Sequence, residues 1–501
     1  MKENYSLERY LEILNENDLV VDTNIQDINQ IVKYLSCNSK DVETGTLFIC
    51  KGLHFKEQFL KDAMKQGSIC YVSDKKYDIE APCIIVKDIR IAMAYLSDLF
   101  YHSSWKNLNL VGITGTKGKS TTSYFVKYIL DAYLESLKKQ KSGIISTIHT
   151  FDGKTEYESH ITTPESIDLH KLFQTAVTHN VEYMEMEVSS QALKYNRVLG
   201  VTFDIGVFLN IGYDHISDVE HENFQDYFQS KLLLFKQCKK AFVNLNTDHL
   251  EEVLEASKAC SNVKTFGVDT PDADIYGYEV KKKNREIHFM VKTKNYTKEF
   301  CISMPGLFNV QNALAAIAIC DALNIPQEFI YNGLKSARVS GRMEVYESND
   351  QNVVGIVDYA HNGLSFEKLF QSVKEEYSGY HISIVFGCPG DKAYDRRKDL
   401  GEIAGKYADT IYLTEDDPGE EEVIDICHEI GGHIEGQNNT YTIILDREEA
   451  IEKAILETQG KTVVLVAGKG NDNSQRRGRQ YVEMPTDSEY TMRALKKYNE
   501  R

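Results

Sequence analysis

The sequence predicts an α/β protein built from three domains. Short apolar runs, typical of buried strands, alternate with helical patterns over most of the chain. A glycine-rich loop follows one of these strands and precedes a long helix near residue 115, an order typical of nucleotide-binding α/β domains. The length of 501 residues is also enough for about three domains of ordinary size.

The first domain is expected over residues 1–105. Residues 1–18, MKENYSLERYLEILNEND, have the spacing of an amphipathic helix. The strands expected after it are the apolar runs TLFIC, SICYV and CIIV. The polar stretch YHSSWKNLN at 101–109 then marks the end of a small α/β unit.

The second domain is expected over residues 106–340. It begins with the strand LNLVGIT at 108–114, the glycine-rich loop and the helix TTSYFVKYILDAYL at 121–134. Further strands are predicted in FDIGVFLNI and KAFVNLN. The third domain is expected over residues 341–501, where the strands HISIVFGC, TIYLTED and TVVLVAG alternate with helices. This alternation predicts a mostly parallel, Rossmann-like sheet.

The composition is typical of a cytosolic, multidomain globular protein. With 57 basic and 75 acidic residues, the net charge is −18, which argues against binding nucleic acid through bulk charge. No apolar run approaches the roughly 20 residues that span a bilayer, and the first residues lack the apolar core of a signal peptide. Ten scattered cysteines show neither a zinc-ribbon nor a disulfide pattern. We therefore expect a cytoplasmic protein with no nucleic-acid partner and no membrane insertion. We also expect a monomer, although none of these features determines the oligomeric state.

The loop between the first strand and helix of the second domain has the residues of a phosphate-binding site. Glycines let backbone N–H groups converge on phosphate oxygens, and a helix N-terminus adds partial positive charge. Lys119 is placed to neutralise the β- and γ-phosphates, and the Ser120 hydroxyl to join a magnesium shell. The spacing from Gly112 departs from the standard phosphate-loop pattern, but the core of the loop still predicts ATP binding. Its residues are Gly115, Thr116, Lys117, Gly118, Lys119, Ser120 and Thr121.

Two functions are compatible with an ATP site alone. One is an enzyme that uses ATP to activate a small substrate, and the other is a non-enzymatic switch or motor. A motor would normally have an acidic D-E strand end and a surface for a partner or a polynucleotide, and the sequence has no recognisable form of either. The motifs that follow favour the enzyme.

Seven short motifs occur along the chain after the phosphate loop. They are TTPE (162–165), EVSSQAL (187–193), YDHISDVEHENFQDYFQSKLLLF (213–235), GLFNVQNALAA (306–316), GRMEVYE (341–347), VDYAH (357–361) and AGKG (467–470). In this order they resemble the Mur ligases, and the resemblance runs from about Ser36 to the C-terminus. Folylpolyglutamate synthetases share the phosphate loop and the general plan, but TTPE and EVSSQAL are closer to the Mur ligases that extend the muramoyl peptide.

The resemblance implies an ATP-dependent acid–amino-acid ligase of peptidoglycan biosynthesis. Its expected substrate is UDP-N-acetylmuramoyl-L-alanyl-D-glutamate (UDP-MurNAc-dipeptide below), which receives a third amino acid through an acyl phosphate. The resemblance makes Lys119, Glu187, His215 and Lys231 catalytic, with Ser120, Glu187 and His215 around Mg²⁺. It also implies that Lys231 is carbamylated (N6-carboxylysine), which requires a neutral amine and therefore a lowered pKa. A solvated strand end at Glu187 and a solvated lysine at Lys231 are the alternatives.

Binding residues are also implied by the resemblance. Asn309 matches a position near adenine, Arg342 one that reaches the ATP phosphates, and Asp358 one at the ribose. A solvated or helix-capping carboxylate is the alternative for Asp358. The residues implied for UDP-MurNAc-dipeptide are Ser39, Thr162, Thr163, Ser189 and Arg197.

The third domain has the residues expected to select the added amino acid. Family members that add meso-diaminopimelate typically have D-N-P-R, whose arginine binds the distal carboxylate. Here Gly419 replaces that arginine, and the form D-D-P resembles members that add L-lysine. We therefore expect lysine, with meso-diaminopimelate or ornithine as alternatives. The implied amino-acid-binding residues are Arg397, Asp416, Asp417, Gly468 and Asp472.

Several features of this region leave the identity of the amino acid open. Asp472 stands where the family has a glutamate, and CPGDK at 388–392 replaces the usual G-G-D-R-D. The run EDDPGEEE at 415–422 suits an incoming cation, but a solvated helix start is an equal alternative. The basic run RRGR at 476–479 is expected to be a solvated loop.

Overall fold

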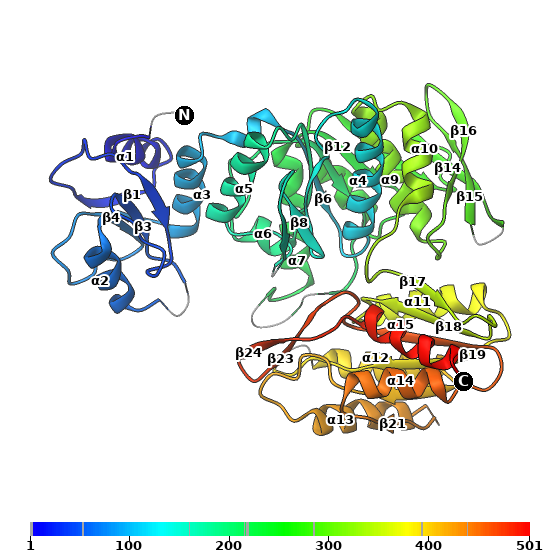
Figure 1. Ribbon diagram of the computed structural model, residues 1–501. Coiled ribbons are helices and arrows are strands. Elements are labelled where there is room, and N and C mark those ends of the chain that lie inside the picture. The colour runs from blue at the N-terminus through cyan, green and yellow to red at the C-terminus, as the bar shows by residue number, and fades with distance from the viewer. Residues whose placement is uncertain are drawn as a thin grey trace.

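A computed structural model describes the chain over residues 4–52, 55–159, 161–214, 216, 220–283, 286–391, 394–437 and 439–501. The described part builds three large sheets and one separate hairpin (Figure 1). The large sheets lie within residues 20–86, 109–302 and 344–467. This arrangement is the α/β fold that the sequence predicts, while the exact domain limits remain a prediction.

The first sheet has the strand order β1-β5-β4-β3-β2. The helix that precedes this sheet buries Leu7, Tyr10 and Leu14. These residues have the three-to-four-residue spacing that is expected of an amphipathic helix. The elements are α1 (Leu7–Glu16), β1 (Val20–Asn24), β2 (Tyr34–Ser36), β3 (Thr46–Ile49), α2 (Glu57–Gln66), β4 (Ser68–Ser73), β5 (Cys83–Val86), α3 (Ile89–Phe100) and the short 3₁₀ helix η1 (Ser104–Asn107).

The second sheet has the order β16-β15-β14-β13-β12-β11-β6-β10-β7-β8-β9 and is parallel from β14 to β7. Its strands are β6 (Asn109–Thr114), β7 (Gly143–Ile145), β8 (His149–Phe151), β9 (Glu156–Glu158), β10 (Tyr183–Glu187), β11 (Phe203–Phe208), β12 (Cys238–Asn244), β13 (Val263–Val268), β14 (Ile275–Lys283), β15 (Glu286–Lys292) and β16 (Thr297–Ile302). Its helices are α4 (Lys119–Ser136), α5 (Ser166–Thr178), α6 (Ser190–Lys194), α7 (Phe224–Leu232), η2 (Leu233–Gln237), α8 (Leu250–Ser257), α9 (Asn309–Ala322) and α10 (Gln327–Ser336).

Two apolar cores cover the faces of this second sheet. One packs α4, α9 and α10 against the strands, and the other packs α5 and α7 on the opposite side. Residues 313–320 of α9 are all almost fully buried, as expected for a helix that lies between a sheet and other helices. The apolar cores therefore hold both β6 and α4, which flank the phosphate loop.

The third sheet has the order β17-β18-β22-β19-β20-β21 and is parallel except for β17. Its elements are β17 (Glu344–Glu347), β18 (Val353–Asp358), α11 (Gly363–Glu376), β19 (His381–Phe386), α12 (Asp395–Tyr407), β20 (Thr410–Leu413), α13 (Val423–Glu435), β21 (Thr442–Ile443), α14 (Arg447–Leu456), β22 (Thr462–Ala467) and α15 (Asp487–Asn499). The hairpin consists of β23 (Ser474–Arg477) and β24 (Gln480–Glu483). In the described part of the chain, no helix is long and apolar enough to cross a membrane.

Candidate active site

The phosphate loop connects the C-terminal end of β6 to the first turn of α4. Since β6 lies between β10 and β11 in the parallel part of the sheet, the loop is at the switch point where such sheets bind ligands. Gly118 has a φ of +87°, and a β-carbon there would lie 2.2 Å from Oδ1 of Asn312. A side chain is therefore excluded immediately before α4. This conformation brings the loop onto the helix N-terminus, which favours phosphate.

Side chains from distant segments hold the loop backbone. Asn210, which follows β11, accepts a hydrogen bond from the Lys117 N–H at 2.8 Å and donates to the Lys117 carbonyl at 3.0 Å. The Tyr227 hydroxyl, from α7, donates to Oγ1 of Thr116 at 3.0 Å. Sequence reasoning missed both residues, because each contacts the loop from about a hundred positions away.

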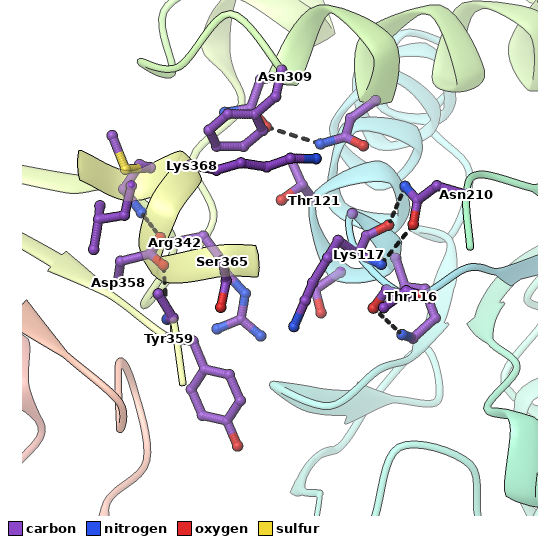
Figure 2. Close-up of a pocket in the computed structure, with 18 of the residues that line it drawn as sticks. Thr116, Lys117, Thr121, Asn210, Asn309, Arg342, Asp358, Tyr359, Ser365 and Lys368 are labelled. Atoms are coloured by element: carbon purple, nitrogen blue, oxygen red, sulfur yellow. Dashed lines mark hydrogen bonds between the residues drawn. The ribbon is translucent and has the colours of Figure 1, made fainter. Parts of the chain in front are cut away.

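A cavity separates the phosphate loop from the third domain (Figure 2). Gly115 does not line it, but its carbonyl oxygen accepts a hydrogen bond from Nζ of Lys119 at 2.9 Å. The predicted residues that line the cavity are Thr116, Lys117, Gly118, Lys119, Ser120, Thr121, Thr162, Glu187, Asn309, Arg342 and Asp358. Lining residues that were not assigned to the site include Thr147, Asn210, Tyr359, Ser365 and Lys368. The structure therefore brings together nucleotide residues that sequence analysis drew from the phosphate loop and from three later motifs.

The third domain forms the far wall of this cavity. The Arg342 guanidinium lies 4.3 Å from the centre of the Tyr359 ring, a distance that favours a cation–π contact. The Asp358 carboxylate accepts hydrogen bonds from the N–H groups of Met343 and Ala360, both at 2.8 Å. Burial raises the pKa of Asp358, while the nearby Arg342 opposes that shift. Asp358 thus presents a fixed carboxylate to the cavity (Figure 2).

The two sides of the cavity are joined directly. Nδ2 of Asn362, at the start of α11, donates to the Asp214 carboxylate at 2.8 Å. The same oxygen accepts from Nζ of Lys117 at 3.3 Å. Since Lys117 belongs to the phosphate loop, this contact links the loop to the third domain.

Two buried lysines lie beside the loop. Burial lowers the pKa of Lys119, against the attraction of Glu187. Lys231 is 1% exposed, and its Nζ donates to the Gly115 carbonyl at 3.0 Å and lies 4.6 Å from the centre of the Tyr227 ring. Burial, together with the charge of Lys119, holds the pKa of Lys231 well below its usual range. The neutral amine that carbamylation requires is therefore favoured at Lys231.

The carboxylate of Glu187 faces the phosphate loop from the end of β10. It is almost fully buried and accepts hydrogen bonds from the N–H and the hydroxyl of Thr147, at 3.0 and 3.2 Å. Ser120, in the first turn of α4, lines the same cavity. This set of oxygen donors fits Mg²⁺, which proteins usually bind through one or two carboxylates together with substrate phosphates. The expected third member, His215, lies outside the described residues.

Three residues expected to bind the substrate surround Glu187. The Thr163 hydroxyl donates to the Glu187 carbonyl at 2.8 Å and accepts from the Ser189 N–H at 3.0 Å. Thr162 accepts a hydrogen bond from the hydroxyl of Thr147, the residue that also contacts the Glu187 carboxylate. The TTPE and EVSSQAL motifs are therefore adjacent in space.

An ion-pair cluster joins the first and second domains beside these residues. Nε of Arg197 lies 2.8 Å from a Glu165 oxygen, and its NH1 donates to the Thr163 carbonyl at 3.2 Å. Lys51, which follows β3, pairs with the other oxygen of Glu165. Lys51 also lines a shallow surface hollow that contains Ser39. Lys51 was not recognised from the sequence, because its partner lies 114 positions away.

Four of the five residues expected to bind the amino acid meet beyond the C-terminal ends of β20 and β22. They are Asp416, Asp417, Gly468 and Asp472. Asp417 accepts from Nζ of Lys469 at 2.8 Å. Gly468 has a φ of +113°, and a β-carbon there would lie 2.3 Å from an oxygen of Asp416. Burial raises the pKa of Asp416 and brings the pKa of Asp472 to about 6. The Gly468 N–H also donates to the Asp358 carbonyl at 3.2 Å, so this cluster adjoins the nucleotide cavity.

Arg397, which the resemblance implies in binding the amino acid, is buried and paired with two acids of this chain. Its guanidinium is 3% exposed and pairs with Glu421 at 2.9 Å and Glu429 at 2.5 Å. Its Nε is buried without a hydrogen-bond partner among the described residues. Two acids therefore compete with any substrate carboxylate for Arg397.

Comparison with known proteins places this architecture in a family. The model of the Mur ligase middle domain matches residues 113–320, and that of the Mur ligase glutamate ligase domain matches residues 341–470. The chain is 40% identical to the UDP-N-acetylmuramoyl-L-alanyl-D-glutamate–L-lysine ligase of Streptococcus thermophilus, covering 94% of this chain and 95% of the relative. Its identity to the ligase of the same name from Enterococcus faecalis is 41%, covering 89% and 88%.

A solved structure of a UDP-N-acetylmuramoyl-L-alanyl-D-glutamate–2,6-diaminopimelate ligase has the same fold. It superposes with a TM-score of 0.68 at 21% identity, covering 99% of both chains. The family models and the relatives at 40% identity cover most of the chain and include the motifs that line the cavity. The chain therefore belongs to the Mur ligase family, whose members are ATP-dependent, amide-forming ligases.

Proposed function

We propose that the chain joins L-lysine to the D-glutamyl residue of UDP-MurNAc-dipeptide, using ATP and releasing ADP and phosphate. The observation that carries this proposal is the cavity between the phosphate loop and the third domain. Glu187 lies on one wall of the cavity, and the acidic cluster of Asp416, Asp417 and Asp472 lies beyond the opposite wall. The relatives that are named as L-lysine ligases support the choice of lysine. The three domains would bind UDP-MurNAc (1–105), ATP (106–340) and the amino acid (341–501).

The nucleotide would lie in the cavity with its phosphates on the loop. Backbone N–H groups of the loop and the Lys119 ammonium would offset the charge of the triphosphate. Arg342 and Asp358 from the third domain would contact the phosphates and the ribose, and Asn309 the adenine. Because these residues come from two domains, a nucleotide in this position would hold the domains together and exclude water.

Glu187 and Ser120 would hold Mg²⁺, which supplies positive charge where two anions must approach each other. Thr147 orients the Glu187 carboxylate through its N–H and its hydroxyl. Thr162, Thr163, Ser189 and Arg197 would position the dipeptide on the same side. These contacts would place the D-glutamyl carboxylate beside the γ-phosphate, as transfer requires.

The reaction then has two steps. A carboxylate oxygen attacks the γ-phosphorus, ADP leaves, and the carboxylate becomes an acyl phosphate. The α-amine of lysine attacks the acyl carbon as the neutral amine, and phosphate leaves with the electrons of the broken C–O bond. The nitrogen gives up one proton to solvent, which leaves a neutral amide. Asp416, Asp417 and Asp472 would attract the cationic amino acid to the third domain.

The assay that tests this proposal measures phosphate release with ATP, Mg²⁺ and UDP-MurNAc-dipeptide. We expect release to require both the dipeptide and an amino acid, and to be fastest with L-lysine among lysine, meso-diaminopimelate and ornithine. Phosphate release that is stimulated by a folate in place of UDP-MurNAc-dipeptide would contradict the proposal. So would release that needs only a macromolecular partner.

Lys231→Ala is expected to lower kcat about 10²-fold. A carbamate on Lys231 would supply a negative group beside the metal, which alanine lacks, and a short carboxylate such as acetate should restore part of the activity. In the wild type, carbon-13 NMR under labelled CO₂ should show a carbamate signal that Lys231→Ala loses. An amine that only donates to Gly115 would give no such signal and no rescue by acetate.

The KM for lysine is expected to depend on pH through Asp472. Burial brings the pKa of Asp472 to about 6, so the carboxylate is ionised at pH 7 and largely protonated at pH 5. We expect the KM to rise about tenfold between these values, because a neutral acid no longer attracts an ammonium. Asp472→Asn should give a high KM with a weaker dependence on pH over this range, and any slope that remains is expected from Asp416, whose pKa burial also raises. Asp425→Asn, at an exposed site on α13, should retain the wild-type profile. A profile in Asp472→Asn as steep as that of the wild type would contradict the assignment.

A further inference from the structure

Each arginine of the basic run at 476–479 forms an ion pair with an acidic residue of the third domain. The sequence predicts a solvated loop there, but the structure forms the β23–β24 hairpin, which lies against the loop 415–422. The Gly419 N–H donates to the Arg476 carbonyl, and the Gly478 N–H donates to the Gly419 carbonyl. The ion pairs are Arg476 with Asp391 at 3.1 Å, Arg477 with Glu415 at 2.7 Å and Arg479 with Glu420 at 2.9 Å.

Among these pairs, Arg476 and Asp391 lie closest to Gly419. Oδ2 of Asp391 accepts from Arg476 and also from the Glu420 N–H at 3.0 Å. A β-carbon on Gly419 would lie 2.2 Å from this oxygen and 3.3 Å from Cζ of Arg476. Gly419 has a φ of +63°, so both its conformation and its surroundings exclude a side chain. Asp391 and Arg476 therefore occupy the space beside Gly419.

Arg476 also touches the cluster proposed to bind the amino acid. Its backbone N–H donates to Oδ1 of Asp417 at 2.9 Å, and the same oxygen accepts from Lys469. When Asp416, Asp417 and Asp472 are ionised, the cations near them among the described residues include Lys469, Arg342 and Arg447. Arg447 is already paired with Asp487, so Lys469 and Arg342 balance two of the three negative charges. The guanidinium of Arg476 would balance another, but Asp391 offsets it.

We propose that Asp391 is a specificity-determining residue, because it neutralises Arg476 beside the amino-acid site. The inference rests on the proposed function. With Arg476 paired, the cluster keeps an excess of negative charge, which favours the distal ammonium of lysine. meso-Diaminopimelate is lysine with an additional carboxylate next to that ammonium, and the negative cluster repels it. Removing the Asp391 charge would free the guanidinium of Arg476, which can bind a carboxylate with two hydrogen bonds.

The test uses the full chain and the phosphate-release assay, with kcat/KM measured for lysine and for meso-diaminopimelate. Asp391→Asn is expected to lower the lysine-to-diaminopimelate ratio at least about tenfold, chiefly through faster use of diaminopimelate. Asp391→Asn combined with Arg476→Gln should return the ratio to within about threefold of the wild type. Arg479→Gln is the matched control, because it removes an 84% exposed guanidinium from the same turn and should leave the ratio unchanged.

If Asp391→Asn is active with lysine and its lysine-to-diaminopimelate ratio is unchanged, this inference is overturned while the proposed function stands. If thermal melting shows that this variant does not fold, Arg476→Gln decides instead. That variant leaves Asp391 uncompensated and should raise the ratio, so an unchanged or lower ratio would overturn the inference. Wild-type enzyme that releases phosphate with neither amino acid would contradict the proposed function and this inference with it.

Discussion

Lys119→Met is expected to lower kcat/KM for ATP about 10³-fold, with little change in the fold. Lys119 lies in the first turn of α4, and its Nζ donates to the carbonyls of Gly115 and Thr116 at 2.9 and 3.3 Å. It lines the cavity opposite Arg342 and Asp358. Methionine has a similar length but no charge, so the triphosphate would lose the positive charge of Lys119. The fold should be retained, because methionine has a high helix propensity.

The measurement is steady-state phosphate release with saturating UDP-MurNAc-dipeptide and lysine. Lys139→Met is the control, because Lys139 makes an exposed ion pair with Glu182 beyond the end of α4. This control should keep wild-type activity within about twofold. If Lys119→Met retains more than about a tenth of the activity while circular dichroism shows an intact fold, the phosphates do not bind on this loop as proposed.

Arg447→Met is expected to destabilise the protein by about 3–5 kcal/mol. Arg447 is fully buried, and its Nε and NH2 both donate to Asp487 at 2.7 Å. Its other donors bind the carbonyls of Glu415 and Ala467, at 3.1 and 2.9 Å. The substitution leaves Asp487 as a buried charge without its counter-ion and leaves two backbone carbonyls without a donor.

Urea unfolding followed by circular dichroism measures this effect. Arg493→Met is the control, because Arg493 makes a 3.5 Å pair with Glu448 at the surface and should cost less than about 1 kcal/mol. Replacing both Arg447 and Asp487 by apolar residues should cost less than Arg447→Met alone, because no buried charge is then left unpaired. A loss below about 1 kcal/mol in Arg447→Met would mean that water reaches this pair in solution.

Sequence analysis predicted those parts of the fold and site that depend on local pattern. The strand–loop–helix order around residue 115 reflects the conformational freedom of Gly118 and the orphan N–H groups of a helix start, and both are local properties. The burial of Leu7, Tyr10 and Leu14 in α1 follows from their spacing alone. The α/β class follows in the same way from alternating strands and helices.

Contacts between distant segments could not be predicted in this way. Asn210 binds the phosphate loop only because β11 lies next to β6, and Lys51 reaches Glu165 only because the first domain packs on the second. RRGR has the composition of a solvated loop, and its pairing with acids about 60 to 85 positions away depends on the hairpin's position in the fold. The enclosure of Arg397 by Glu421 and Glu429 likewise depends on how α12 and α13 pack.

The most direct test of the proposed reaction traces oxygen. The enzyme is given ATP, Mg²⁺, lysine and UDP-MurNAc-dipeptide labelled with oxygen-18 in its D-glutamyl carboxylates, and both products are analysed by mass spectrometry. We expect a UDP-MurNAc-tripeptide that contains lysine, and one oxygen-18 in each phosphate released, because an acyl phosphate transfers its bridging oxygen to phosphate. Phosphate without the label, or no product containing lysine, would contradict the account.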